Sequence, residues 1–201
     1  MFLLHRWLIL IYSLYDNHSL LIVKLFLFVL ITAGCDHSVR KVSVDAYFSM
    51  DSLLDAQLIS SNGSVRAEKR VLLDGKEEVQ SVTFDSSDWA NELKIFRDFE
   101  LNKANYVGAY QVTEGESFTR YDLKKGEKSP VEYLKLELKE ESVASIEGEF
   151  LEDRAIYQHQ RKIKLYLEDK KISHYEVTGF QKMISKDTIK YAITSEVEIV
   201  D

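Results

Sequence analysis

Apolar and polar side chains alternate along most of the chain from Tyr110 onward. The alternation is clearest in residues 134–138, 144–150, 163–167, 172–180 and 189–199. A period of two puts the apolar side chains on one face of a β-strand, so each stretch predicts a strand with one buried and one solvent-facing side. Short turns at residues 168–171 and around 186–187 make consecutive strands antiparallel neighbours. This half of the chain therefore predicts a meander of about six strands.

A further strand signal lies before this meander. Residues 65–84 hold Asp74 and Gly75 between two runs of alternating character. Both residues tolerate the positive φ angles that a two-residue hairpin turn requires. The segment therefore predicts an antiparallel hairpin, which brings the expected total to six to eight strands.

Two other segments have the spacing of amphipathic helices. The first has apolar residues at Val44, Tyr47, Phe48, Leu54 and Leu58. Its candidate N-cap is Asp45, and its pattern ends at residues 60–63. The second runs from Trp89 to Leu101, after candidate caps at residues 86–88. Their aromatic and aliphatic faces are typical of core packing.

A sheet with one apolar face must cover that face, and these two helices are the large apolar surfaces available for it. We therefore expect an α+β fold, in which a curved antiparallel β-meander of about six to eight strands packs against two N-terminal helices. The curvature could reach that of a half barrel. Residues 43–201 are long enough for one such domain and too short for two.

The region before this domain has the composition of a targeting signal. Lys24 is followed by the apolar run LFLFVLI and then by TAGC, which ends at the only cysteine of the chain, Cys35. A basic, apolar and small-residue order is typical of secretory signals. The apolar run is too short to cross a bilayer as a helix, which takes about 20 residues.

The TAGC motif resembles the lipobox of bacterial lipoproteins, although Thr32 replaces the larger aliphatic residue that is usual there. The resemblance implies that residues 1–34 are a signal peptide and that Cys35 carries a thioether-linked diacylglycerol. Residues 35–42 would then form the lipidated cysteine and a short tether. The alternative is that Cys35 is a buried or free structural cysteine. Residues 1–19 are also apolar, so either two runs form a hairpin in the membrane or translation starts near residues 20–23, which we favour.

The acidic composition excludes some partners. The chain has 26 basic and 33 acidic residues, and removal of residues 1–34 leaves 24 and 32. Such a protein is repelled by nucleic acid, and we expect none as a partner. We also expect this acidic protein to gain no electrostatic attraction to anionic lipid, so membrane attachment is assigned to the lipid on Cys35.

The order of these features resembles the small uncharacterised lipoproteins of Bacteroidota. The resemblance rests on the lipobox, the polar tether, the hairpin turn Leu73–Lys76, and a helix opening with Asp88 and Trp89. It implies a cell-envelope location, at the outer or inner membrane and facing the periplasm, but no activity. Asp36, directly after Cys35, resembles the signal that retains lipoproteins at the inner membrane of enteric bacteria. That signal does not transfer safely to other phyla, so the choice of membrane stays open. The plan of a curved sheet over helices is also similar to that of periplasmic lipoprotein carriers.

The sequence offers no pattern for catalysis, a cofactor or a metal. His159 and His174 lie mid-strand and could face each other across a sheet, but solvent-facing histidines are usually plain surface residues. No serine lies in a nucleophile elbow, the glycines form no phosphate loop, and the acidic residues are typical of a solvated face. We therefore expect a non-enzymatic protein.

Tyrosine is the one residue type in mild excess, with 11 in the chain. Most of them read as ordinary half-buried sheet residues. If a binding surface exists, we expect it where an aromatic sheet face meets the loop of residues 102–110. The candidate residues for that surface are Tyr106, Tyr110, Tyr133, Tyr157 and Tyr175.

Three functions compete. The first is an envelope lipoprotein that binds an apolar ligand or a partner protein through its curved sheet, which predicts a connected apolar cavity between sheet and helices. The second is a structural or assembly subunit that docks through a strand edge or the tyrosine face, which predicts a filled core and an exposed apolar patch. The third is an enzyme, which would need polar residues that converge in a pocket, for example His159 and His174 with a carboxylate.

Overall fold

The computed structural model describes residues 45–61 and 64–199, all within the compact unit Val42–Asp201. The expected signal peptide, Cys35 and the tether lie outside the described residues. The helical elements are α2 (Met50–Ser60), α3 (Ser86–Arg97) and the 3-10 helix η1 (Ala104–Tyr106). The strands are β1 (Ser64–Leu73), β2 (Lys76–Asp85), β3 (Tyr110–Glu114), β4 (Phe118–Leu123), β5 (Val131–Lys139), β6 (Ser142–Arg154), β7 (Tyr157–Glu168), β8 (Lys171–Met183) and β9 (Ile189–Ile199).

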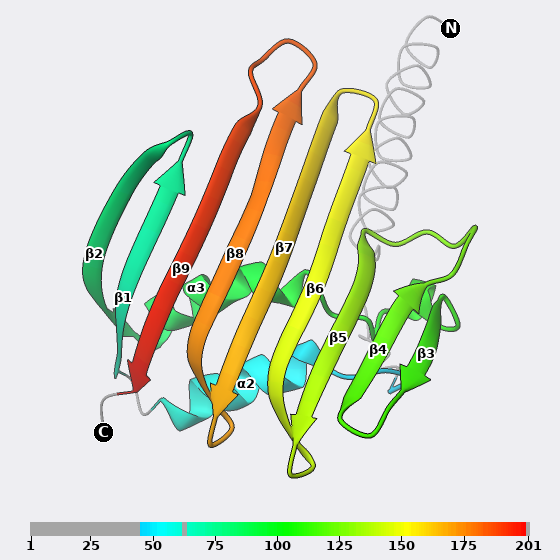
Figure 1. The fold of residues 1–201 in the computed structure, drawn as a ribbon, viewed down its shortest axis with the longest axis horizontal. Coiled ribbons are helices and arrows are strands. Elements are labelled where there is room, and N and C mark those ends of the chain that lie inside the picture. Colours follow the sequence, from blue (N-terminus) through cyan, green and yellow to red (C-terminus); the bar gives the residue numbers. More distant parts are fainter. Residues whose placement is uncertain (1–44, 62–63, 200–201) are drawn as a thin grey trace, which may run out of the picture. The chain divides into compact units, whose positions relative to one another are not determined.

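All nine strands form one antiparallel sheet in the order β2-β1-β9-β8-β7-β6-β5-β4-β3 (Figure 1). Strands β3 to β9 follow one another as the expected meander. The hairpin β1–β2 is attached at its far side, where β1 pairs with the C-terminal strand β9. Within the described chain the sheet is open, with β2 at one edge and β3 at the other.

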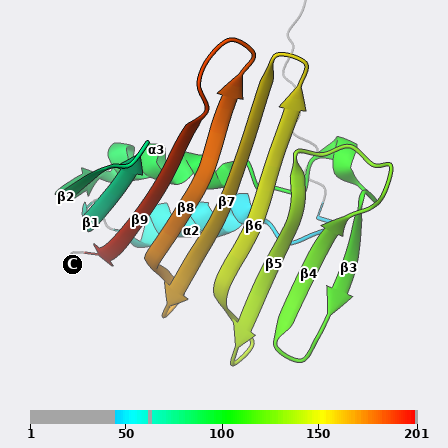
Figure 2. The same ribbon diagram turned by 45° about the horizontal axis from the view of Figure 1, so that its top comes forward.

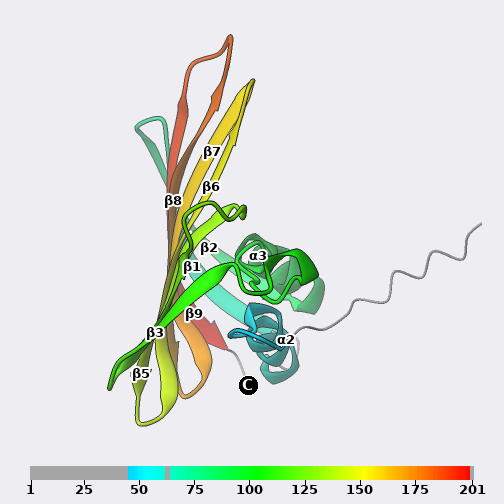
Figure 3. The same cartoon turned by 90° about the vertical axis from the view of Figure 1, so that its right-hand side faces the viewer.

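Both helices lie on the same face of the sheet, as the edge-on view in Figure 3 shows. We call this the inner face and the opposite side the outer face. The sheet is curved, and its long central strands extend beyond the helices at one end (Figures 2 and 3). None of the described helices is long and apolar enough to span a membrane.

Side chains fill the space between the sheet and the helices. Leu54 from α2, Phe96 from α3 and Leu134 from β5 each have 0% of their surface exposed. A void large enough for a water molecule would register as exposed surface on the side chains that line it, so these residues border none. Other fully buried large side chains are Trp89, Tyr175, Phe99, Met50, Leu93, Leu101, Ile146, Ile163 and Leu165. The connected apolar cavity expected for a ligand carrier is absent around these core residues.

The α+β class and the antiparallel sheet are as predicted, with two corrections. The sheet has nine strands and not six to eight, since the short strands β3 and β4 were not counted separately. The helices are not both N-terminal, because α3 follows the β1–β2 hairpin. The hairpin itself is confirmed: Asp74 and Gly75 form its turn with φ angles of 47° and 81°.

The start of α2 differs from the expectation, because Ser49 caps it and not Asp45. The Ser52 amide donates to Ser49 Oγ at 3.1 Å. Glu100 adds a second cap from outside the helix, since its carboxylate accepts from the Asp51 amide at 2.8 Å. A carboxylate at a helix N-terminus satisfies orphan N–H groups and opposes the positive end of the helix dipole.

The N-cap of α3 lies one residue before the expected caps, and the helix itself begins at Ser86. Asp85 is its N-cap and accepts a hydrogen bond from the Asp88 amide at 2.8 Å. The helix ends at Arg97, short of the expected Leu101. Phe99 and Leu101 still enter the core, but from the irregular segment that follows.

Candidate functional site: the free edge of the sheet

Strand β2 is a long edge strand with one strand neighbour, β1, in the described part of the chain. It has ten residues, and the side chains from Lys76 to Ser81 are all exposed. The opposite edge strand, β3, has five residues and starts at the buried Tyr110. Shortening is one way in which proteins protect an edge, and β2 lacks this protection.

The hairpin register decides which backbone groups of β2 are free. Leu73 and Lys76 flank a two-residue turn, so they form a hydrogen-bonded pair. From Lys76 onward, every second residue therefore points its N–H and C=O toward β1. The intervening residues point theirs away from the sheet; they are Glu77, Val79, Ser81, Thr83 and Asp85. These groups could pair with one more antiparallel or parallel strand.

Charge along β2 is concentrated toward its ends. Residues 79–83 read VQSVT and carry no charge, whereas Glu77 and Glu78 precede them and Asp85 follows. Edge charges normally discourage another strand from pairing. The uncharged centre of β2 leaves about five residues open to pairing, with acidic groups at both limits.

A small apolar patch lies beside this edge. Val79 is 51% exposed and Leu72 is 41% exposed. Val79 pairs with Arg70 and Leu72 pairs with Glu77, so the two side chains share one face of the hairpin as diagonal neighbours. Extended peptides that add to a sheet edge place alternate side chains against such neighbours.

The hairpin turn is fixed to the body of the sheet. The Asp74 amide donates to the Lys190 carbonyl at 3.0 Å, and the Lys190 amide donates to Asp74 Oδ1 at 2.9 Å. These bonds join the β1–β2 turn to the start of β9. The edge is therefore presented at a fixed position, which lowers the entropy lost when a partner strand binds.

The tyrosines proposed as a binding surface do not form one. Tyr106, Tyr110 and Tyr175 are at most 7% exposed and belong to the core. Burial raises the pKa of Tyr110 and of Tyr175 above the ordinary range. Tyr133 lies on the outer face, where it donates to Glu147 at 2.6 Å, and Tyr157 lies beside His159 on the inner face. The five are thus divided between the two faces.

The loop of residues 102–110 has a structural task. The Asn102 side chain accepts from the Ala46 and Tyr47 amides at 3.0 and 2.8 Å and donates to the Tyr47 carbonyl at 2.9 Å. These bonds hold the segment that leads into α2. Both acceptor positions of the Asn102 carbonyl oxygen are used on this segment.

His159 and His174 lie on opposite faces of the sheet, so they cannot act together. His159 is 6% exposed on the inner face, where its Nε2 lies 3.0 Å from the Tyr191 hydroxyl. Burial holds the pKa of His159 below its ordinary value. The Tyr191 ring reaches it across β8 because Gly179 lies between them; a Cβ there would be 2.6 Å from the Tyr191 hydroxyl. The expectation that His159 faces solvent is wrong.

His174 lies on the outer face between two carboxylates. Its Nε2 is 3.4 Å from Glu176 and its Nδ1 is 2.9 Å from Glu196. No group of three His, Cys or acidic side chains in the described residues has the arrangement of metal ligands. His174 is therefore a half-buried residue of the outer face whose two ring nitrogens each lie near a carboxylate.

A partly buried polar network under α3 escaped the sequence analysis. The Tyr175 hydroxyl donates to Glu92, whose carboxylate also lies 2.7 Å from Lys69 Nζ. These residues come from β8, α3 and β1, so the network joins the helix to two separate strands. A glutamate on the inner side of α3 was the available signal. The charges of Glu92 and Lys69 are paired with each other, so we interpret the network as one that stabilises the packing of α3 on the sheet.

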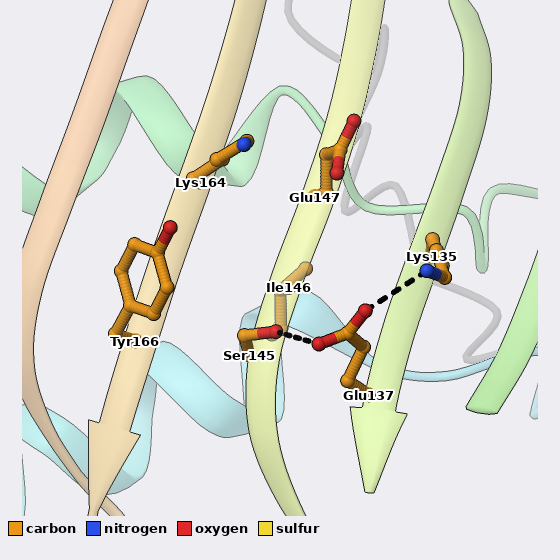
Figure 4. Close-up of a pocket in the computed structure, with 7 residues that line it drawn as sticks. All are labelled: Lys135, Glu137, Ser145, Ile146, Glu147, Lys164 and Tyr166. Carbon is orange, nitrogen blue, oxygen red and sulfur yellow. Dashed lines mark hydrogen bonds and ion pairs between the residues drawn. The ribbon is translucent and has the colours of Figure 1, made fainter. Parts of the chain in front are cut away.

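The outer face carries a shallow polar depression of about 100 Å³, shown in Figure 4. Glu137 receives hydrogen bonds there from Lys135 at 2.9 Å and from Ser145 at 3.2 Å. The Lys135 ammonium lowers the pKa of the Glu137 carboxyl. The remaining residues that line it are Ile146, Glu147, Lys164 and Tyr166. Its charges neutralise one another, which is typical of a solvated sheet face.

Comparison with known proteins finds no counterpart for this arrangement: no family model, no curated protein and no solved structure matches the chain.

Proposed function

We propose that this chain is a non-enzymatic, lipid-anchored assembly subunit of the bacterial cell envelope, and that it docks a partner protein through the free edge of β2. The lipid on Cys35 would hold it at the outer or inner membrane, facing the periplasm. The partner would add an extended segment to the sheet as a tenth strand. The observation that carries the proposal is the exposed, ten-residue edge strand with an uncharged centre.

The filled interior favours an assembly subunit over a ligand carrier. A carrier needs a cavity that accepts its cargo, and the interlayer residues Leu54, Phe96 and Leu134 have no exposed surface. An assembly subunit needs a stable body and an accessible surface. The sheet and its helices supply the first, and the edge with Val79 and Leu72 supplies the second.

The chemistry of β2 defines the partner segment. It should be extended, carry small or apolar side chains opposite residues 79–83, and have basic residues opposite Glu77 and Asp85. Backbone pairing with Val79, Ser81 and Thr83 would contribute most of the affinity, because those three residues offer six free hydrogen-bonding groups. Glu77 and Asp85, at the two ends of the uncharged stretch, would repel acidic partner segments.

A proline at position 81 tests the docking. Ser81 points its N–H away from β1, so Ser81→Pro removes an edge donor and leaves the β1 ladder intact. The matched control, Ser81→Ala, keeps the donor. A photo-crosslinking side chain at position 79 should give a discrete protein adduct in the envelope with the control and lose at least tenfold of it with the proline, as expected for one lost hydrogen bond plus steric exclusion. Equal adducts in both variants would contradict docking at this edge.

The anchor is tested separately. Mass spectrometry of the mature N-terminus should find a lipid-modified Cys35 as the first residue. An unmodified Cys35, or a chain that begins at Met1, would contradict the lipoprotein assignment without affecting the edge. The enzyme alternative has no support from the geometry of His159 and His174, which are on opposite faces.

A further inference from the structure

The loops at the two ends of the sheet differ in composition. Because consecutive strands are antiparallel, the β4–β5, β6–β7 and β8–β9 connections share one end with the Asp74–Gly75 turn, at the top of Figure 1. The β3–β4, β5–β6 and β7–β8 turns share the other. The first end is apolar and basic, and the second is acidic or neutral.

Exposed aliphatic side chains gather on two neighbouring loops of the first end. Ile156, in the β6–β7 turn, is 69% exposed, and Ile184, in the β8–β9 loop, is 71% exposed. The two loops touch, since the Ile184 amide donates to the Ile156 carbonyl at 3.2 Å. Met183 beside them is 50% exposed. In the described chain, the β5–β6 and β7–β8 turns at the other end carry no exposed large apolar residue.

Basic residues outnumber acidic ones around these side chains, although Glu152 and Asp153 precede the β6–β7 turn and Glu152 pairs with Arg154 at 3.0 Å. Residues 181–190 are all exposed and contain three lysines and one aspartate. The β4–β5 loop at the same end, residues 124–130, has three lysines and one glutamate. The whole chain has a net charge of −7, so this end is locally positive on an acidic protein. At the other end, residues 114–117 hold two glutamates and no basic residue.

We propose that this end of the sheet contacts the surface of an anionic bilayer. We call residues 154–157 and 182–190 the basic tip. Ile156, Met183 and Ile184 would enter the boundary between head groups and acyl chains, and Lys182 and Lys186 would lie at the lipid phosphates. Aliphatic side chains that project among lysines are the combination by which peripheral proteins bind such surfaces.

The charge of the tip selects the bilayer as its occupant. An anionic lipid surface attracts each lysine within a Debye length, and the apolar layer beneath its head groups accepts the three aliphatic side chains. Ten residues separate Asp45 from the proposed anchor Cys35, and these span at most about 35 Å, so the anchor keeps the domain close to the bilayer. The inference needs the anchor only to bring a bilayer near, and it is independent of docking at β2.

A local fluorescent probe tests this. The full-length chain with Cys35→Ser receives one new cysteine, Ile184→Cys at the tip or Lys139→Cys at the opposite end, and each is labelled with an environment-sensitive nitrobenzoxadiazole dye. Because the apolar N-terminal segment can bind vesicles by itself, the comparison between the two positions is the measurement. Vesicles are phosphatidylcholine alone or mixed with phosphatidylglycerol.

We expect the dye at position 184 to shift to the blue and to be quenched by spin-labelled lipid on the anionic vesicles, with little change at position 139. Ile156→Ser should lower the inserted fraction about tenfold, because it removes one buried aliphatic side chain. Lys182→Glu with Lys186→Glu should abolish the preference for phosphatidylglycerol. No shift at 184, or an equal shift at both positions, would overturn the proposal.

Discussion

Substitution of Gly148 by alanine tests whether the interior of this protein is filled, which separates an assembly subunit from a ligand carrier. Gly148 lies in β6 at the inner face, opposite Leu134 of β5. A Cβ at this position would lie 2.8 and 2.9 Å from two ring carbons of Phe99 and 3.1 Å from a methyl carbon of Leu134. Carbon atoms pack at about 3.5–4.0 Å, so the new methyl group overlaps both neighbours.

Phe99 and Leu134 cannot move away from the added methyl group, because other side chains surround them. Phe99 and Leu134 are 0% exposed, and the Phe99 ring packs against Phe150 with centroids 6.2 Å apart. Overpacking of a filled core costs about 1–3 kcal/mol. The lower entropy of alanine in the unfolded chain offsets about 0.4–1 kcal/mol of this. We therefore expect Gly148→Ala to destabilise the protein by about 1–2 kcal/mol.

Urea unfolding of the chain from residue 35, with Cys35→Ser, measures this difference. Trp89 is the only tryptophan after residue 34 and is buried, so its fluorescence reports unfolding. Phe99→Leu in the same background should recover most of the loss, giving a coupling energy of at least about 0.5 kcal/mol between the two positions. A neutral or stabilising Gly148→Ala would mean that space exists between sheet and helices, and the hypothesis of a ligand carrier would then regain support.

Three further predictions follow from the described contacts. In the free protein, hydrogen exchange along β2 should alternate, with the Ser81 amide fast and the Gln80 amide slow, because only the latter bonds to β1; equal rates would contradict the register. Glu100→Ala should destabilise the fold by about 2–4 kcal/mol in urea unfolding, since it leaves the backbone amides of Asp51 and Asn102 without an acceptor. Glu100→Gln should destabilise it by less, because the glutamine side chain keeps one acceptor oxygen. Because the pKa of His159 is lowered in the folded protein, the unfolded chain binds a proton at His159 below pH about 6.5 more readily than the folded chain does. The free energy of unfolding should therefore fall as pH drops below about 6.5, and His159→Gln should make it less dependent on pH.

The strands were predictable because alternation is a local property. Residues 134–138 and 163–167 alternate strictly, and both lie in observed strands. Asp74 and Gly75 marked their hairpin for an equally local reason, since both adopt positive φ. The cap of α2 was missed because Ser49 and Asp45 are both good N-caps, and the choice depends on the distant contacts that Glu100 and Asn102 make with this segment.

The candidate site depends on long-range pairing that alternation does not encode. Nothing local in β1 indicates that its free side pairs with β9, more than 100 residues later, and this pairing makes β2 the edge. The uncharged stretch 79–83 between acidic residues was the available signal. The tyrosines failed as a site because a tyrosine has the same strand preference on either face, and tertiary packing placed Tyr110 and Tyr175 in the core.

Hydrogen exchange on the complex of this protein with its crosslinked partner tests the central claim most directly, because strand addition changes one set of amides only. The account predicts that the amides of Val79, Ser81 and Thr83 pass from fast to slow exchange in the complex, while Gln80 and Val82 are slow in both states. Unchanged exchange at Val79, Ser81 and Thr83, with protection appearing on another surface, would contradict docking at the free edge of the sheet.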